Sequence, residues 1–164
     1  MQVFGITGWK NSGKTTLTER LVTEITGRGL SVSTIKHAHH SVDIDQPGKD
    51  SFRHRAAGAG EVLLASAHRW AIMHELRGVD EPTVDQLLEK LSPVDLVLIE
   101  GFKRNGHAKI EASVKPGRPL IALGDPSIKA VAAGYDLDTV NAPVIDINDI
   151  AAIADFILRE VGLA

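Results

Sequence analysis

Short apolar runs and amphipathic stretches alternate along the chain, and this pattern predicts its secondary structure. Apolar runs of strand length predict buried strands, at residues 2–7, 31–36, 93–100, 109–114, 120–126, 128–132 and 144–145. The run over 120–126 is expected to pass into a turn. Apolar positions with helical spacing predict helices at residues 16–28, 83–91 and 149–161.

The order of these elements predicts the kind of sheet. Residues 2–36 read as strand, helix and strand, a unit whose two strands run parallel. Two further apolar runs, 61–66 and 69–76, are separated only by Ala67 and His68 and predict a β-hairpin. We therefore expect an α/β protein with a mostly parallel sheet flanked by helices and a hairpin extension, formed as a single domain over 1–164.

The segment between the first strand and the first helix carries the clearest motif. Residues 8–16 read Gly-Trp-Lys-Asn-Ser-Gly-Lys-Thr-Thr and match G-x-x-x-x-G-K-[ST], the phosphate-binding P-loop. Gly8 and Gly13 allow the backbone to approach a polyphosphate closely, and the N-terminus of the helix attracts anions. Lys14 is expected to contact the β- and γ-phosphates, and Thr15 to bind Mg²⁺. All nine residues, Gly8, Trp9, Lys10, Asn11, Ser12, Gly13, Lys14, Thr15 and Thr16, are predicted to hold the nucleotide.

An acidic residue is expected to complete this site. P-loop proteins place an acid at the end of a neighbouring strand to hold Mg²⁺ or its water. Glu100 ends the apolar run 93–100 and is the predicted acid, whereas Asp95 lies near the start of that strand and is expected to be structural. The basic loop that begins at Lys103 follows directly. Asp125, in a turn, is a candidate for base recognition. The guanine-reading motif Asn-Lys-x-Asp is absent, so the local sequence does not decide between guanine and adenine.

Residues 36–55 are unusually rich in histidine, aspartate and basic side chains. This segment follows a predicted strand, which is where open α/β sheets bind ligands. It is interpreted as a phosphate or substrate loop, with a transition-metal site and a solvated polar loop as alternatives. A short helix is expected from Asp50 or Ser51 to Ala57. The candidate pocket residues are His37, His39, His40, Asp45, Lys49, Asp50 and Arg53, together with Lys103.

Composition narrows the function classes. The chain has 43% hydrophobic and 24% charged residues and a net charge of −3, which does not favour a nucleic-acid partner. It has no cysteine, so disulfides and thiolate metal sites are excluded and a cytoplasmic location is expected. Neither a membrane-spanning run nor a cleavable leader is expected from the sequence.

Taken together, these blocks resemble the molybdopterin-guanine dinucleotide biosynthesis protein B (MobB) family. The resemblance covers nearly the whole chain and is carried by residues 8–16, the Lys-His-Ala-His-His block at 36–40, Asp45, residues 48–51 and 53–59, and Glu100-Gly101-Phe102-Lys103. It implies a P-loop NTPase fold and a homodimeric GTP-binding adaptor with weak GTPase activity. Its implied partners are Mg²⁺ and the enzyme that joins GMP to molybdopterin, with molybdopterin itself as a further candidate.

Other functions compatible with these residues were weighed against the adaptor. A histidine-bearing metallochaperone NTPase would use the block at His37, His39 and His40 to carry nickel or zinc. A small-molecule kinase of the P-loop class would use arginines such as Arg53 near an acceptor. A binding module with a purely structural nucleotide would show no turnover.

Overall fold

The computed structural model describes residues 1–38, 43–137 and 140–164. The chain forms two compact units, one made of residues 1–37 and 84–164 and the other of residues 38–83. The prediction of a single domain over 1–164 stays a prediction. His39 and His40 lie outside the described residues.

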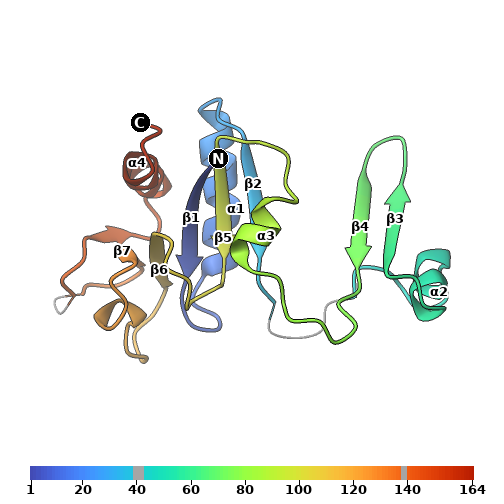
Figure 1. Ribbon diagram of the computed structural model, residues 1–164. Coiled ribbons are helices and arrows are strands. Elements are labelled where there is room, and N and C mark those ends of the chain that lie inside the picture. Colours follow the sequence, from blue (N-terminus) through green and yellow to red (C-terminus); the bar gives the residue numbers. More distant parts are fainter. Residues whose placement is uncertain (39–42, 138–139) are drawn as a thin grey trace. The chain divides into compact units, whose positions relative to one another are not determined.

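The larger unit is built on a six-stranded parallel sheet. Its strand order is β2-β5-β1-β6-β7-β8, and every neighbouring pair is parallel (Figure 1). The strands are β1 (Gln2–Thr7), β2 (Val32–Lys36), β5 (Leu96–Glu100), β6 (Lys109–Ser113), β7 (Ile128–Ala133) and β8 (Val144–Asp146). Since all strands run the same way, their carboxyl ends meet at one edge. The expected α/β fold with a mostly parallel sheet is confirmed.

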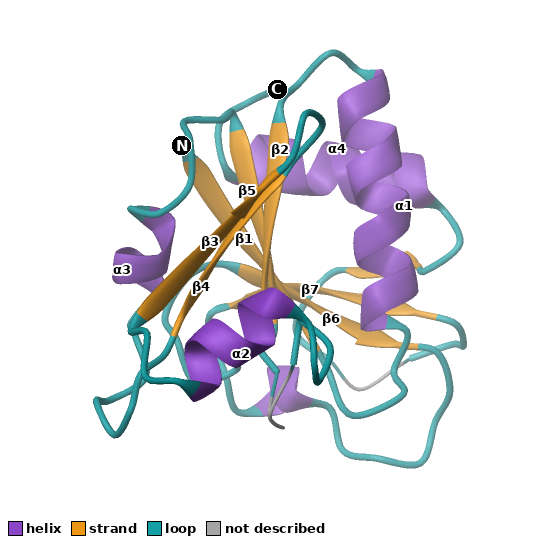
Figure 2. Cartoon of the chain, turned by 90° about the vertical axis from the view of Figure 1, so that its right-hand side faces the viewer, coloured by secondary structure: helices purple, strands orange, loops and turns teal. Residues whose placement is uncertain are grey.

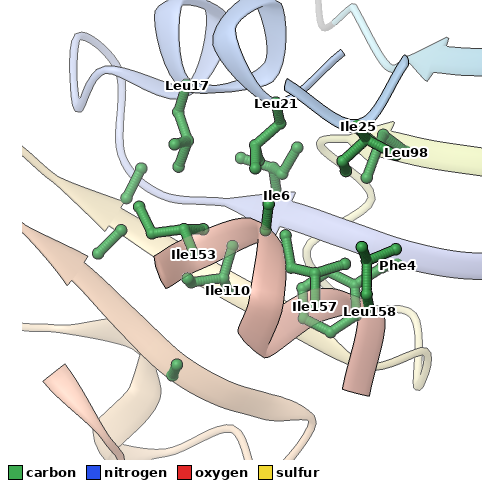
Figure 3. Packing of buried hydrophobic residues seen from close by; sticks show 14 of the residues in the cluster. Phe4, Ile6, Leu17, Leu21, Ile25, Leu98, Ile110, Ile153, Ile157 and Leu158 are labelled. Atoms are coloured by element: carbon green, nitrogen blue, oxygen red, sulfur yellow. The ribbon is translucent and has the colours of Figure 1, made fainter. Parts of the chain in front are cut away.

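Helices cover both faces of this sheet. Helices α1 (Lys14–Gly27) and α4 (Ile150–Glu160) share one core with the strands, in which Phe4, Ile6 and Ile110 meet helical residues such as Leu21 and Ile157 (Figure 3). On the other face, the short helix α3 (Val84–Leu88) packs through Val84 against Val97 and Ile99. A central strand buried from both sides explains why the run 93–100 is almost entirely apolar.

One predicted strand is replaced by a different structure. The run 120–126 was expected to be extended, but Ile121–Leu123 forms a 3₁₀ turn, η1. The Glu111 carboxylate accepts the backbone N–H groups of Ile121 and Ala122 at 3.0 and 2.9 Å. These donors are therefore used by a side chain of β6 and not by a neighbouring strand. The strand prediction for this run was wrong.

The smaller unit is a hairpin with one helix. Strands β3 (Glu61–Ala65) and β4 (Trp70–His74) pair antiparallel, and helix α2 (Asp50–Ala56) precedes them (Figure 2). The expected hairpin and short helix are both present. The Arg55 side chain binds Asp43, Asp45 and Glu75 in ion pairs of 3.0, 2.5 and 2.6 Å and so ties the loop before α2 to the end of β4. Among the described residues, no helix is long and apolar enough to span a membrane.

Candidate nucleotide-binding site

The P-loop joins β1 to α1 as the motif predicts. Gly8 has a φ of 143°, and a Cβ there would lie 2.6 Å from the Ala112 carbonyl oxygen. Gly13 has a φ of 93°, and its Cβ would lie 2.5 Å from Val114 Cγ1. Neither position accommodates a side chain without displacing its neighbours. The loop therefore closes around a cleft of about 350 Å³, lined by Asn11, Ser12, Gly13, Lys14, Thr15, Thr16 and Val114.

Lys14 is the charged group at the start of α1. Its Nζ donates to the Trp9 carbonyl oxygen at 2.7 Å, which holds the side chain back over the loop. A lysine ammonium has three donors, so two remain for ligand oxygens. Burial, followed by the charge of Lys103, lowers the pKa of Lys14, while Glu100 opposes this shift and Lys36 adds to it. The cations Lys14, Lys36 and Lys103 thus favour an anionic ligand here.

Thr15 and Glu100 bring two oxygen donors together at the start of α1 and the end of β5. The Thr15 hydroxyl donates to Glu100 Oε1 at 3.1 Å, and Lys36 Nζ lies 3.6 Å from the same oxygen. The Glu100 side chain is only 12% exposed. A hydroxyl and a carboxylate at the carboxyl edge of β5 are the hard oxygen donors that Mg²⁺ prefers, and Mg²⁺ takes its other ligands from phosphate and water. The donor set therefore fits an Mg²⁺–nucleotide complex.

His37 lies beside this acid and contacts the loop that follows β5. Its backbone N–H donates to the Glu100 carbonyl oxygen at 2.8 Å. Its ring stacks on Phe102 with the centroids 4.3 Å apart. The beginning of the His-rich block is therefore anchored next to Glu100. Within the described parts of the chain, no group of three or more His, Cys, Asp or Glu side chains is arranged to hold a metal ion.

Trp9 has surroundings that the motif alone does not predict. Its indole Nε1 donates to the Pro119 carbonyl oxygen at 2.8 Å. The Lys103 ammonium lies 4.7 Å from the ring centroid and the Arg118 guanidinium 5.7 Å from it. Both separations are within the range of cation–π attraction. Trp9 thus connects the P-loop to the loop after β6 and has Lys103 beside its ring, while a role of Lys103 in the pocket stays a prediction.

The remaining predicted pocket residues belong to the smaller unit. Asp45 accepts from the Arg55 guanidinium, and this hydrogen bond lowers the pKa of Asp45. Lys49 precedes α2, where the Asp50 carboxylate lies 3.9 Å from Arg53. Asp45 therefore has a clear structural role within its own unit. For Asp45, Lys49, Asp50 and Arg53, a place in the nucleotide pocket stays a prediction.

Asp125 does not lie where a base-reading residue would. It precedes β7, at the amino end of the parallel sheet, whereas the P-loop follows the carboxyl end of β1. Its carboxylate accepts from Ser127 N at 2.9 Å and lies 3.4 Å from the Nζ of the buried Lys109. This candidate was wrong, because the run 120–126 does not carry Asp125 to the carboxyl edge. At the other end of β7, the Tyr135 hydroxyl lies 3.0 Å from Ser113 Oγ.

The sequence-based predictions also missed buried charges on the sheet. Lys109 and Glu111 alternate with the apolar residues of β6 and are almost completely buried. Their regular spacing places both side chains on the face of the sheet opposite α1 and α4. This alternation was the one feature of the sequence that could have indicated two charges on a single face of the strand. They hold the segments around Asn105 and η1, so their role is structural.

Asp95 is structural, as predicted. Its carboxylate accepts from the Ser31 amide at 2.8 Å and from the Ser31 hydroxyl at 2.6 Å. These bonds join the starts of β2 and β5, at the edge of the sheet away from the P-loop.

Comparisons with known proteins identify the family of this chain. The profile of the family described as molybdopterin guanine dinucleotide synthesis protein B (MobB) matches residues 3–134. A molybdopterin-guanine dinucleotide biosynthesis adapter protein from Haemophilus influenzae is 42% identical over 94% of this chain and 86% of its own length. The protein of the same description from Escherichia coli is 38% identical over 92% of this chain and 88% of its own.

A solved structure extends the likeness to three dimensions. The crystal structure of a molybdopterin-guanine biosynthesis protein B has a TM-score of 0.74 and 28% sequence identity, and the match covers 96% of this chain and 99% of that one. The P-loop, the Thr15–Glu100 pair and the six-stranded parallel sheet thus occur in a chain that matches the family over most of its length. This chain belongs to the MobB family of molybdopterin-guanine dinucleotide synthesis proteins.

Proposed function

We propose that this protein is a GTP-binding adaptor with slow GTPase activity that assists the attachment of GMP to molybdopterin in the cytoplasm. The observation that carries the proposal is the hydrogen bond between Thr15 and Glu100 beside the Lys14 ammonium. A hydroxyl, a carboxylate and a cation that lie together support the binding of an Mg²⁺–triphosphate. The adapter names of the relatives that are 42% and 38% identical support the biosynthetic role.

In this proposal, Lys14 and Glu100 have different tasks. Lys14 uses its two remaining donors on the β- and γ-phosphate oxygens, and the low dielectric around this half-buried group strengthens both bonds. Glu100 and Thr15 hold Mg²⁺, which neutralises charge on the phosphates when it is bound. The proposal assigns Glu100, which contacts Thr15 and Lys36, to the metal and not to the attacking water. Because no residue is assigned to orient that water, hydrolysis is expected to be slow.

The proposal includes a partner enzyme and a homodimer, and the hairpin offers a surface for the homodimer. The hairpin face that carries Leu63, Trp70 and Ile72 is exposed, with 60%, 65% and 48% of these residues accessible. Leu63 pairs with Ile72 and Ala65 with Trp70, so these apolar side chains lie on the same face of the two strands. An exposed apolar face of this kind supports pairing with a second copy of the chain.

The first test is nucleotide selectivity, read by Trp9. Trp70→Phe leaves Trp9 as the only tryptophan, in the loop that surrounds the phosphate cleft. GTP and ATP are each titrated with Mg²⁺ while emission is followed. We expect saturable GTP binding that is much tighter than ATP binding and is lost in Lys14→Ala, since that change removes the phosphate-binding ammonium.

Two outcomes would contradict the proposal. A preference for ATP would favour a small-molecule kinase of the same fold. No binding of either nucleotide by calorimetry would remove the assignment of residues 8–16 as a nucleotide site.

A further inference from the structure

A second cavity lies next to the phosphate cleft. It has a volume of about 310 Å³ and is formed by P-loop residues 9–12 on one side and residues 113–118, at the end of β6 and in the following loop, on the other. The two cavities share Asn11, Ser12 and Val114. A ligand in the second cavity would therefore lie beside a nucleotide bound at Lys14 and Thr15. Lys14 and Thr15, which are assigned to the phosphates and Mg²⁺, do not line it.

The described side chains that line this cavity carry charge of one sign. Lys10, Lys115 and Arg118 line it, and no carboxylate is among the described lining residues. None of these three cations forms an ion pair with any residue in the described ranges 1–38, 43–137 and 140–164. The whole chain has a net charge of −3, so this concentration of positive charge does not follow from composition. A one-signed cleft concentrates anions.

Trp9 holds this arrangement in place. Its Nε1–H bond to the Pro119 carbonyl oxygen fixes the end of the loop that carries Lys115 and Arg118. Its ring attracts the Arg118 guanidinium at 5.7 Å, which restrains that side chain at the cavity wall. The backbone carbonyl oxygen of Trp9 also accepts a hydrogen bond from the Lys14 ammonium. Trp9 thus contacts groups of both cavities.

We propose that this second cavity binds the phosphate group of a second ligand, a phosphate monoester, next to the nucleotide in the P-loop. A phosphate monoester carries a charge of about −1.5 to −2 at neutral pH and three acceptor oxygens, which suits the cations Lys10, Lys115 and Arg118. Arg118 supplies a planar fork for two of these oxygens. The inference rests on the proposed function, because it takes the P-loop to be filled by GTP.

The test measures phosphate binding while the P-loop is occupied. The full-length protein is saturated with a non-hydrolysable GTP analogue and Mg²⁺, and phenyl phosphate is titrated by calorimetry. The test variant is Lys115→Gln with Arg118→Gln. The matched control is Lys90→Gln with Arg159→Gln, which removes one exposed lysine and one exposed arginine elsewhere in the same unit. We expect saturable binding that is at least tenfold weaker in the test variant and unchanged in the control.

The source of the bound phosphate is distinguished by two further titrations. The GTP analogue alone is titrated into the unmodified protein and into the test variant, and phenyl phosphate is titrated into the nucleotide-free protein. Equal affinity of the analogue for both proteins supports a separate site. Weaker analogue binding in the test variant, without any phenyl phosphate binding to the loaded protein, would assign the cavity to the nucleotide and overturn the proposal.

Failure of this inference is distinct from failure of the proposed function. If the analogue binds but phenyl phosphate does not, or binds equally to both double variants, only the second site is disproved. If the analogue itself does not bind, the function proposed for the P-loop is disproved.

Discussion

Glu100 shows how one side chain links several parts of the site. It ends β5, accepts the Thr15 hydroxyl at the start of α1 and lies 3.6 Å from the ammonium of Lys36 at the end of β2. Three elements therefore meet at one carboxylate. Its position as the first polar residue after an apolar run made it predictable from sequence, whereas the Lys36 contact depends on the pairing of β2 with β5.

We predict that Glu100→Gln reduces the effect of Mg²⁺ on GTP binding. The amide retains the size of the side chain but loses the negative charge that attracts the metal. Loss of one group at a metal site commonly lowers metal affinity by about 10- to 100-fold. GTP titrations at increasing Mg²⁺ concentration measure this, with Glu89→Gln as the control. If Glu100→Gln keeps the full Mg²⁺ dependence, Glu100 is not the metal acid.

We also predict an acid-sensitive smaller unit. Hydrogen bonding to Arg55 lowers the pKa of Asp45, so its ionised form stabilises the fold. This contribution is fully present above the unfolded pKa of about 3.9 and is lost as the pH falls through the lower folded value. Trp9→Phe leaves Trp70, in β4, as the reporter for urea unfolding at several pH values.

The variants to compare are Asp45→Asn and Asp80→Asn. Asp45→Asn is expected to lower stability at neutral pH and to flatten the acid dependence, while Asp80→Asn, at an exposed position, leaves both unchanged. An unaltered acid profile in Asp45→Asn would mean that another group controls the unit.

At the scale of elements, the sequence predicted helices and strands correctly where the apolar residues followed a single helical or strand spacing. The strand, P-loop and helix over 2–28, the hairpin and α4 all have a single clear period, and each is present in the structure. Outside β6, which was predicted, the region 101–127 has no such period. The segments around Asn105 and η1 are held by Lys109 and Glu111, two buried charges of β6, so their structure was not predictable from local sequence.

Gly5 tests how tightly this region covers β1. A Cβ at Gly5 would lie 2.5 Å from His107 Nε2 and 2.9 Å from Lys109 Cγ, both on side chains packed against the sheet. We expect Gly5→Ala to destabilise the protein by roughly 1–3 kcal/mol, as overpacking of a core does. Gly27→Ala, in α1 with open space around it, is expected to stabilise by up to about 1 kcal/mol. Thermal unfolding of both variants measures the difference, and equal midpoints would refute the packing argument.

At the scale of the whole molecule, the two units differ in how far their stability depends on contact with a partner. The larger unit buries a core on both faces of its sheet. The smaller unit has two strands and one helix, and a hairpin of this size is marginally stable unless it packs against another surface. A second copy of the chain is the partner that we propose.

We therefore predict that Ile72→Asp shifts the protein from dimer to monomer. The change places a charge in the centre of the exposed face, where burial without a partner charge is costly. Analytical ultracentrifugation over a concentration series measures the dissociation constant. Val79→Asp, exposed but outside the hairpin strands, is the control and is expected to leave the dimer intact. A dimer that survives Ile72→Asp uses another surface.

The strand order of the larger unit has a consequence for synthesis on the ribosome. β1 and β2 are made first but do not pair with each other, because β5 lies between them. The smaller unit is translated in the interval, from residue 38 to residue 83. The pairing of β1 with β2 through β5 therefore cannot begin until residue 100 has left the exit tunnel, and until then the apolar side chains of β1 and α1 have no sheet to pack against. Chains stalled before that point expose these side chains, and we expect them to be bound by chaperones that recognise extended apolar segments.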